Sequence, residues 1–113
     1  MSWIDCCKAL LHGYLSGQAG SSAMLDLLTG KANPSGKLSE TYPVKYPFGF
    51  GLSYTQFSYS NLEIKEDGVT FTITNQGKMA GAEVAQLYVS LSESEVFRPR
   101  KELKGFQKVF LQA

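Results

Sequence analysis

The sequence predicts an α+β fold in which a short strand–helix unit is followed by an incomplete antiparallel β-sandwich. Before residue 46, glycine-rich turns surround a short apolar helical pattern. After residue 57, apolar and polar residues alternate with a period of two, as in half-buried strands. Between them, residues 46–57 (YPFGFGLSYTQF) are dense in glycine and aromatic residues. We therefore predict two domains, residues 1–45 and residues 46–113, joined at this segment.

The first domain begins with a mixed apolar stretch over residues 3–12, which fits either a short helix or a loop that leads into a buried strand over residues 9–15. Glycines at 13, 17 and 20 then indicate a turn. Residues 23–28 predict a short helix, with Ser21 or Ser22 as the N-cap and Gly30 as the C′ residue.

The end of this domain contains a second turn signal, residues 33–36 (NPSG), and then an extended segment over residues 38–43. The order of strand, glycine-rich turn and helix is typical of units that build a parallel sheet.

The second domain predicts about four strands. Val69, Phe71 and Ile73 alternate with threonines, between turn signals at residues 66–68 and 75–78. The next strands are expected at residues 82–91 and 104–111. For residues 82–91 we expect one inward face, whose members are Ala85, Leu87, Val89 and Leu91. The other register, with Val84 and Tyr88 inward, stays open.

Composition restricts the classes of partner. A net charge of +1 gives no electrostatic case for nucleic acid or an anionic membrane, and no apolar run approaches the roughly 20 residues of a membrane helix. We see no signal-peptide pattern at the N-terminus. The adjacent Cys6 and Cys7 are interpreted as free thiols, which favours a cytoplasmic protein, although a secreted or periplasmic parent also fits. Only His12 lies near them as a further ligand, so we expect no metal and no cofactor.

Several blocks of sequence, taken in order, resemble glycoside hydrolase family 3. Residues 13–38 resemble the end of that family's α/β sandwich domain, and residues 46–54 resemble the start of its fibronectin type III-like domain. Residues 83–89 (EVAQLYV) and 98–106 (RPRKELKGF) resemble the strands that follow. The resemblance implies that the chain is a C-terminal portion of an enzyme related to β-glucosidases, which hydrolyse terminal β-linked sugars with retention.

The sequence departs from the family pattern in ways that bear on activity. The family's nucleophile lies in an N-terminal barrel, and its acid/base carboxylate lies before the block that starts at Gly13; no segment here matches either. Family members also carry a longer, aromatic-rich segment between the block that ends here at Pro43 and the block that begins here at Tyr46. In this chain only Val44 and Lys45 lie between these two blocks. We interpret this as an internal deletion. The second domain also has fewer strands than the seven of a complete sandwich.

The carboxylates do not suggest a catalytic pair. Retaining hydrolysis needs two carboxylates about 5–5.5 Å apart, and a raised carboxyl pKa needs burial. None of the ten carboxylates has a sequence context that indicates burial: Asp5, Asp26, Glu40, Glu63, Glu66, Asp67, Glu83, Glu93, Glu95 and Glu102. We therefore expect no catalytic residue in this chain and no activity from it alone.

The aromatic residues of the segment 46–57 are the candidate contact residues. Tyr46, Phe48, Phe50 and Tyr54 fit either interdomain packing or contact with a sugar. The basic run over residues 98–104 fits a solvated strand edge or an acidic partner.

Two functions follow as expectations. The first is the non-catalytic C-terminal portion of a family 3 glycoside hydrolase. The alternative is a stand-alone interaction module or a weak carbohydrate-binding module. Because an incomplete sandwich leaves open sheet edges, we also expect the chain to associate with itself.

Overall fold

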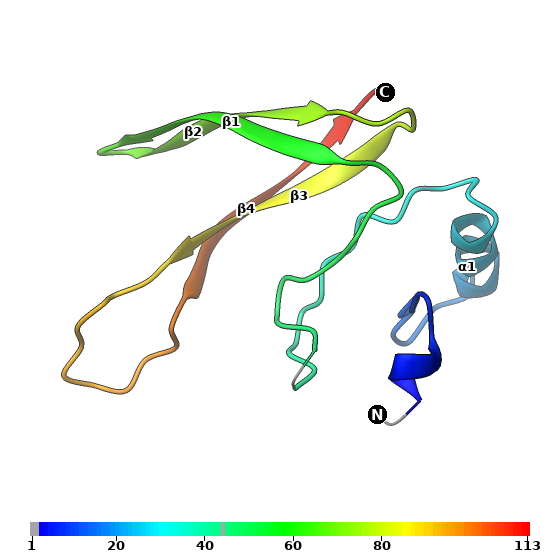
Figure 1. The fold of residues 1–113 in the computed structure, drawn as a ribbon, viewed down its shortest axis with the longest axis horizontal. Helices are drawn as coiled ribbons and strands as arrows, with labels where there is room; N and C mark the ends of the chain where they lie inside the picture. Colours follow the sequence, from blue (N-terminus) through cyan, green and yellow to red (C-terminus); the bar gives the residue numbers. More distant parts are fainter. Residues whose placement is uncertain (1–2, 44) are drawn as a thin grey trace. The chain divides into compact units, whose positions relative to one another are not determined.

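A computed structural model of the protein describes residues 3–43 and 45–113, and the contacts within it define two compact units, residues 1–32 and residues 33–113 (Figure 1). The described part contains one α-helix and four antiparallel strands. The predicted α+β class is therefore confirmed. The predicted domain boundary between residues 45 and 46 stays a prediction.

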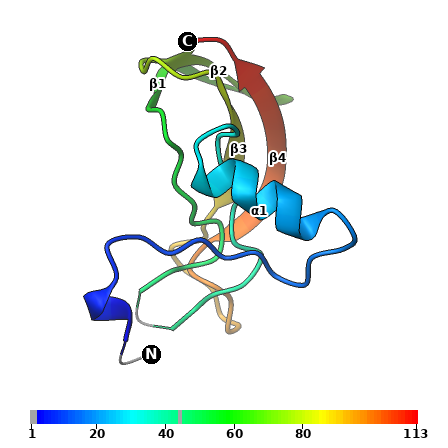
Figure 2. The ribbon, with the colours of Figure 1, turned by 90° about the vertical axis from the view of Figure 1, so that its right-hand side faces the viewer.

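The N-terminal unit contains two short helices. A 3-10 helix, η1, spans Ile4–Cys6, and Ile4 is buried. The helix α1 spans Gly20–Leu28 (Figure 2). The strand expected over residues 9–15 is wrong, because these residues form no strand. Tyr14 has a φ of 49°, which is incompatible with extended backbone, and no strand of this unit is available to pair with the segment.

The ends of α1 agree only in part with the ends predicted from the sequence. The helix begins earlier than expected, with Ala19 as the N-cap and no side-chain cap. Ser22 does not cap the helix; its hydroxyl donates to the carbonyl oxygen of Ala19. At the other end Gly30 has a φ of 75° and its N–H donates to the carbonyl oxygen of Leu27, as expected of a C′ glycine.

The second unit begins with the junction, residues 33–56, which folds back on itself. Leu38 donates to the carbonyl oxygen of Phe50, and Gly49 donates to that of Leu38, at 2.8 and 2.7 Å. Farther along, Tyr42 and Tyr46 exchange two backbone hydrogen bonds. The junction is therefore two chain segments held side by side by backbone hydrogen bonds.

The first hairpin joins β1 (Phe57–Lys65) to β2 (Gly68–Asn75). Its register shifts between Ser60 and Glu63, where Asn61 adopts a φ of 53°. The extra residue is a β-bulge, and it reverses the alternation of side chains along β1. As a result Tyr59, which pairs with Ile73, and Ile64, which pairs with Val69, lie on the same face of the hairpin.

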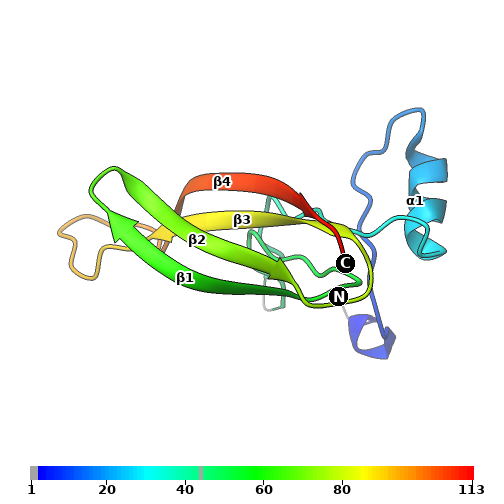
Figure 3. The ribbon, with the colours of Figure 1, turned by 90° about the horizontal axis from the view of Figure 1, so that it is seen from above.

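The second hairpin joins β3 (Gly81–Val89) to β4 (Glu102–Leu111), and it forms a second layer beside β1 and β2 (Figure 3). Ala85 is only 6% exposed, and it lines an open groove between the two hairpins together with residues such as Phe71 and Val109. The expected inward face of β3 is thus confirmed at Ala85, whereas Leu87 and Val89 are 41% and 49% exposed and Leu91 lies beyond the end of the strand. The two two-stranded sheets also confirm the incomplete β-sandwich.

Candidate functional site

The four predicted aromatic residues, Tyr46, Phe48, Phe50 and Tyr54, all lie in the junction. The rings of Tyr46 and Phe50 lie against each other, with centroids 5.2 Å apart and planes tilted by 43°. Phe48 and Tyr54 are 38% and 51% exposed. Their backbone N–H groups donate to Thr41 and to Asn33, at opposite ends of the junction. The structure therefore brings the rings of Tyr46 and Phe50 together and fixes the backbone of Phe48 and Tyr54 at Thr41 and Asn33.

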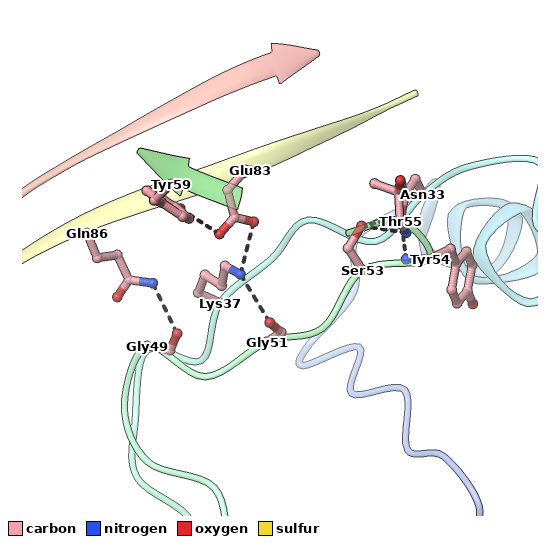
Figure 4. A network of polar contacts seen from close by, with 10 residues as sticks. All are labelled: Asn33, Lys37, Gly49, Gly51, Ser53, Tyr54, Thr55, Tyr59, Glu83 and Gln86. Carbon is pink, nitrogen blue, oxygen red and sulfur yellow. Dashed lines mark hydrogen bonds and ion pairs between the residues drawn. The ribbon is translucent and has the colours of Figure 1, made fainter. Parts of the chain in front are cut away.

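A buried ion pair, which the sequence analysis missed, attaches the junction to the sandwich (Figure 4). The ammonium of Lys37 lies 3.2 Å from Oε2 of Glu83 on β3, and these side chains are only 16% and 12% exposed. The ammonium also donates to the carbonyl oxygen of Gly51, at 3.0 Å. One cation thus binds two neighbouring segments of the junction and one strand.

The second oxygen of this carboxylate accepts a hydrogen bond from the first hairpin. The hydroxyl of Tyr59 on β1 donates to Oε1 of Glu83, at 2.9 Å. Partial burial, and then the hydrogen bond and negative charge of Glu83, raise the pKa of Tyr59 to about 12. Both carboxylate oxygens are therefore engaged, and Glu83 connects the junction, β1 and β3.

Asn33 holds the other end of the junction. Its Oδ1 accepts from the hydroxyl of Ser53 and from the N–H of Tyr54, and its Nδ2 donates to the carbonyl oxygen of Ala80 (Figure 4). Gly81 lies close against the Asn33 side chain, where a larger residue would collide with it. This asparagine fixes the point at which the junction meets the start of β3.

A second asparagine closes the sandwich beside this point. The hydroxyl of buried Thr55 donates to Oδ1 of Asn75, and the amide of Asn75 donates to the carbonyl oxygens of Met79 and Gln112. The end of β2 is therefore linked to the start of β1 and to the end of β4.

The carboxylates show no catalytic arrangement in the part of the chain that the structure describes. The expectation that none is buried is wrong for Glu83, which is held between Lys37 and Tyr59. The signal was present in the sequence, because Glu83 has the same strand parity as the inward Ala85. No carboxylate lines the groove between the hairpins.

The described residues also contain no group of three or more His, Cys, Asp or Glu side chains that could hold a metal ion. Cys6 and Cys7 are exposed free thiols. Within the same residues no helix is long and apolar enough to cross a membrane. The arrangement is therefore a set of polar links between the junction and the two hairpins.

The family of the chain is decided by its sequence. Residues 1–79 match the sequence model of the glycosyl hydrolase family 3 C-terminal domain, and residues 83–113 match that of a fibronectin type III-like domain. The chain belongs to glycoside hydrolase family 3. It comprises the C-terminal part of the family's architecture, as the resemblance implied.

The relatives agree with this assignment. Thermostable beta-glucosidase B of Acetivibrio thermocellus is 41% identical, over 98% of this chain and 21% of that protein. An exo-alpha-(1->6)-L-arabinopyranosidase of Bifidobacterium longum is 32% identical, over 98% of this chain and 20% of that protein. The structure of beta-glucosidase 3B from Thermotoga neapolitana in complex with glucose superposes with a TM-score of 0.89 at 31% identity, over 98% of this chain and 22% of that one.

Two facts follow about the length of this family 3 chain. It spans about a fifth of the length of the curated relatives it matches. Its match to the Acetivibrio protein also extends over 157 residues, whereas this chain has 113, so at least 44 positions of the relative have no counterpart here. An internal shortening relative to that protein is therefore present.

Proposed function

We propose that this chain supplies the non-catalytic C-terminal portion of a β-glucosidase-like family 3 enzyme. The whole enzyme would remove terminal β-linked sugars. The observation that carries the proposal is that the two family sequence models match nearly the whole chain, in the order found in the family.

The geometry supports a structural role. Retaining hydrolysis needs two carboxylates about 5–5.5 Å apart around a bound sugar. Glu83, the buried carboxylate among the described residues, has both oxygens engaged by Lys37 and Tyr59. The role that fits these contacts is to hold the junction against the sandwich.

We do not infer the sugar of the parent enzyme from its relatives. The relatives include both beta-glucosidases and an exo-alpha-(1->6)-L-arabinopyranosidase, although this region is similar in all of them. Similarity in this region therefore distinguishes neither the sugar nor its linkage, and the β-linked class of the proposal rests on the beta-glucosidases alone.

The proposal is tested by a chimaera. This chain would replace the matching portion of the Acetivibrio enzyme, once as it stands and once with the relative's additional residues restored between Tyr42 and Tyr46. We expect the restored chimaera to hydrolyse a chromogenic β-glucoside, and this chain alone to show no turnover. Turnover by the chain alone that is lost with one of its carboxylates would contradict the proposal. So would a restored chimaera that is folded and inactive.

Carbohydrate binding is the second candidate, and the exposed rings of Phe48 and Tyr54 favour it. The test is calorimetric titration of the chain with a β-linked oligosaccharide. Phe48→Ala and Tyr54→Ala should each weaken binding, whereas Phe97→Ala, a change at an exposed aromatic of a different loop, should not. Equal heats in all variants would exclude the junction as the binding surface.

A further inference from the structure

The middle of the junction contains two short stretches of chain that hold each other. We call residues 34–38 and residues 49–52 the paired segments. The N–H of Leu38 donates to the carbonyl oxygen of Phe50 at 2.8 Å, and the N–H of Gly49 donates to that of Leu38 at 2.7 Å. Both hydrogen bonds are internal to the paired segments. They would therefore survive a movement of the two segments away from β3.

Polar contacts to β3 hold both paired segments in place (Figure 4). On the first segment, the Lys37 ammonium lies 3.2 Å from Oε2 of Glu83. On the second segment, the carbonyl oxygen of Gly49 accepts a hydrogen bond from Nε2 of Gln86, at 3.0 Å. The hydroxyl of Tyr88 donates to Oε1 of Gln86, which keeps the amide turned with its nitrogen toward the junction. Each segment therefore has its own contact, and both contacts end on the same strand.

The geometry couples these two contacts. Lys37 is followed by Leu38, whose carbonyl oxygen accepts the N–H of Gly49. The Lys37 ammonium also donates to the carbonyl oxygen of Gly51 on the other segment, at 3.0 Å. Because the segments are bonded to each other as well as to β3, the loss of either contact with the strand weakens the hold on both of them.

The ends of the paired segments meet at Asn33, which supplies a pivot. Its Oδ1 accepts from the hydroxyl of Ser53 and the N–H of Tyr54, at 2.8 and 2.9 Å, and its Nδ2 donates to the carbonyl oxygen of Ala80, at 3.2 Å. These bonds lie outside the paired segments, so release from β3 does not require them to break. No residue of the paired segments is fully buried, so release exposes little apolar surface and costs less than unfolding a hairpin.

We propose that the paired segments dock on β3 as one body and release from it together, while the two hairpins stay folded. In the docked form Lys37 and Gly49 are held by Glu83 and Gln86. In the released form the segments keep the hydrogen bonds between them and turn about Asn33, so that the ammonium and the carboxylate of the ion pair both reach water. This conformational equilibrium belongs to the chain by itself and does not depend on the proposed function.

The test follows Lys37 in the full chain by its rate of acylation with an amine-reactive ester, measured by mass spectrometry of peptides. The Lys37 side chain is 16% exposed and that of Lys65 is 57% exposed, so Lys37 should react more slowly than Lys65. Gln86→Ala removes a contact that does not involve Lys37. It should nevertheless accelerate the acylation of Lys37 about fivefold, the factor that one net hydrogen bond contributes to an equilibrium. Gln107→Ala, the matched control on β4, should leave the rate unchanged.

A second variant and a second measurement complete the test. Tyr88→Phe keeps the ring but removes the hydroxyl that orients the amide of Gln86, so it should accelerate Lys37 by a smaller factor. Amide hydrogen exchange of β1 and β2 should stay as in the unchanged chain. The proposal would be overturned if Gln86→Ala and Tyr88→Phe both left the rate of Lys37 unchanged, because the two contacts would then be independent. It would also be overturned if the strand amides exchanged faster by the same factor as Lys37 reacts, because unfolding of the chain would then expose this lysine.

Discussion

At the scale of single residues, Glu83 carries the connection between the junction and the sandwich. Its carboxylate lies within 3.2 Å of the Lys37 ammonium and accepts the Tyr59 hydroxyl at 2.9 Å. A desolvated ion pair adds little stability compared with an apolar pair of similar volume, but the loss of one partner leaves the other charge buried and uncompensated. The pair therefore penalises any arrangement that separates the junction from β3.

Substitution of Glu83 tests this connection. We expect Glu83→Ala to lower the free energy of unfolding by about 3 kcal/mol. This value is the lower end of the range for removing one partner of a buried ion pair, because both side chains keep some exposure. Replacing both partners, Lys37→Met with Glu83→Leu, should cost less than Glu83→Ala alone. Urea unfolding at matched protein concentration measures both. The exposed Glu95→Ala should change the value by less than about 0.5 kcal/mol. A double variant as unstable as Glu83→Ala would contradict this account.

Tyr59 makes stability depend on alkaline pH. Its pKa is raised to about 12 in the folded chain, against an ordinary value of 10.0. Between these values the unfolded state has already lost the phenolic proton that the folded state retains, so unfolding becomes easier as the pH rises. This contribution is complete below pH 10 and is lost as the pH approaches 12.

The measurement is the absorbance of tyrosinate at alkaline pH, together with unfolding at pH 9 and pH 11. Tyr59→Phe should remove the phenol that titrates near 12 and reduce the loss of stability between the two pH values. Glu83→Gln should lower the pKa of Tyr59, because it removes the negative charge while keeping a hydrogen-bond acceptor. An unchanged titration in both variants would show that Tyr59 does not titrate in this range.

At the scale of secondary structure, the bulge at Asn61 decides which residues of β1 face the groove. A φ of 53° is tolerated by Gly and Asn but strains a β-branched residue. We expect Asn61→Val to lower the free energy of unfolding by roughly 1–2 kcal/mol, and Asn61→Gly to be close to neutral. Thermal unfolding of both variants measures the difference. Equal stability of the Val and Gly variants would mean that the bulge can be removed without cost.

The same elements show what the sequence could predict. The strands after residue 57 were predictable because side chains alternate around strong turn signals at residues 66–68 and 75–78. The strand expected over residues 9–15 was not formed, because apolar content alone does not distinguish a strand from irregular chain when no partner strand is present. The bulge could not be predicted from the sequence, because Asn61 is also compatible with an ordinary strand position. Lys37 and Glu83 lie 46 residues apart in the sequence, so their pairing depends on the tertiary structure.

At the scale of the whole molecule, the junction explains how a shortened family 3 chain keeps this architecture. At least 44 residues of the Acetivibrio protein have no counterpart here. We infer from the sequence that this difference lies between Tyr42 and Tyr46, which exchange two backbone hydrogen bonds. A segment inserted there should leave the hydrogen bond between Leu38 and Phe50 and the ion pair of Lys37 and Glu83 in place.

An insertion tests this directly. A flexible segment of ten Gly and Ser residues placed between Tyr42 and Tyr46 should lower the free energy of unfolding by only about 1 kcal/mol, since each doubling of loop length costs about 0.6 kcal/mol. The same segment placed between Gln76 and Lys78 should cost more, because there the N–H of Gly77 donates to Asn75, whose side chain also binds Met79 and Gln112. Urea unfolding of the two chains gives the comparison. If the first insertion were the more damaging, the hydrogen bonds between Tyr42 and Tyr46 would be an essential part of the fold, and the residues of the relative that this chain lacks would belong at another position in the chain.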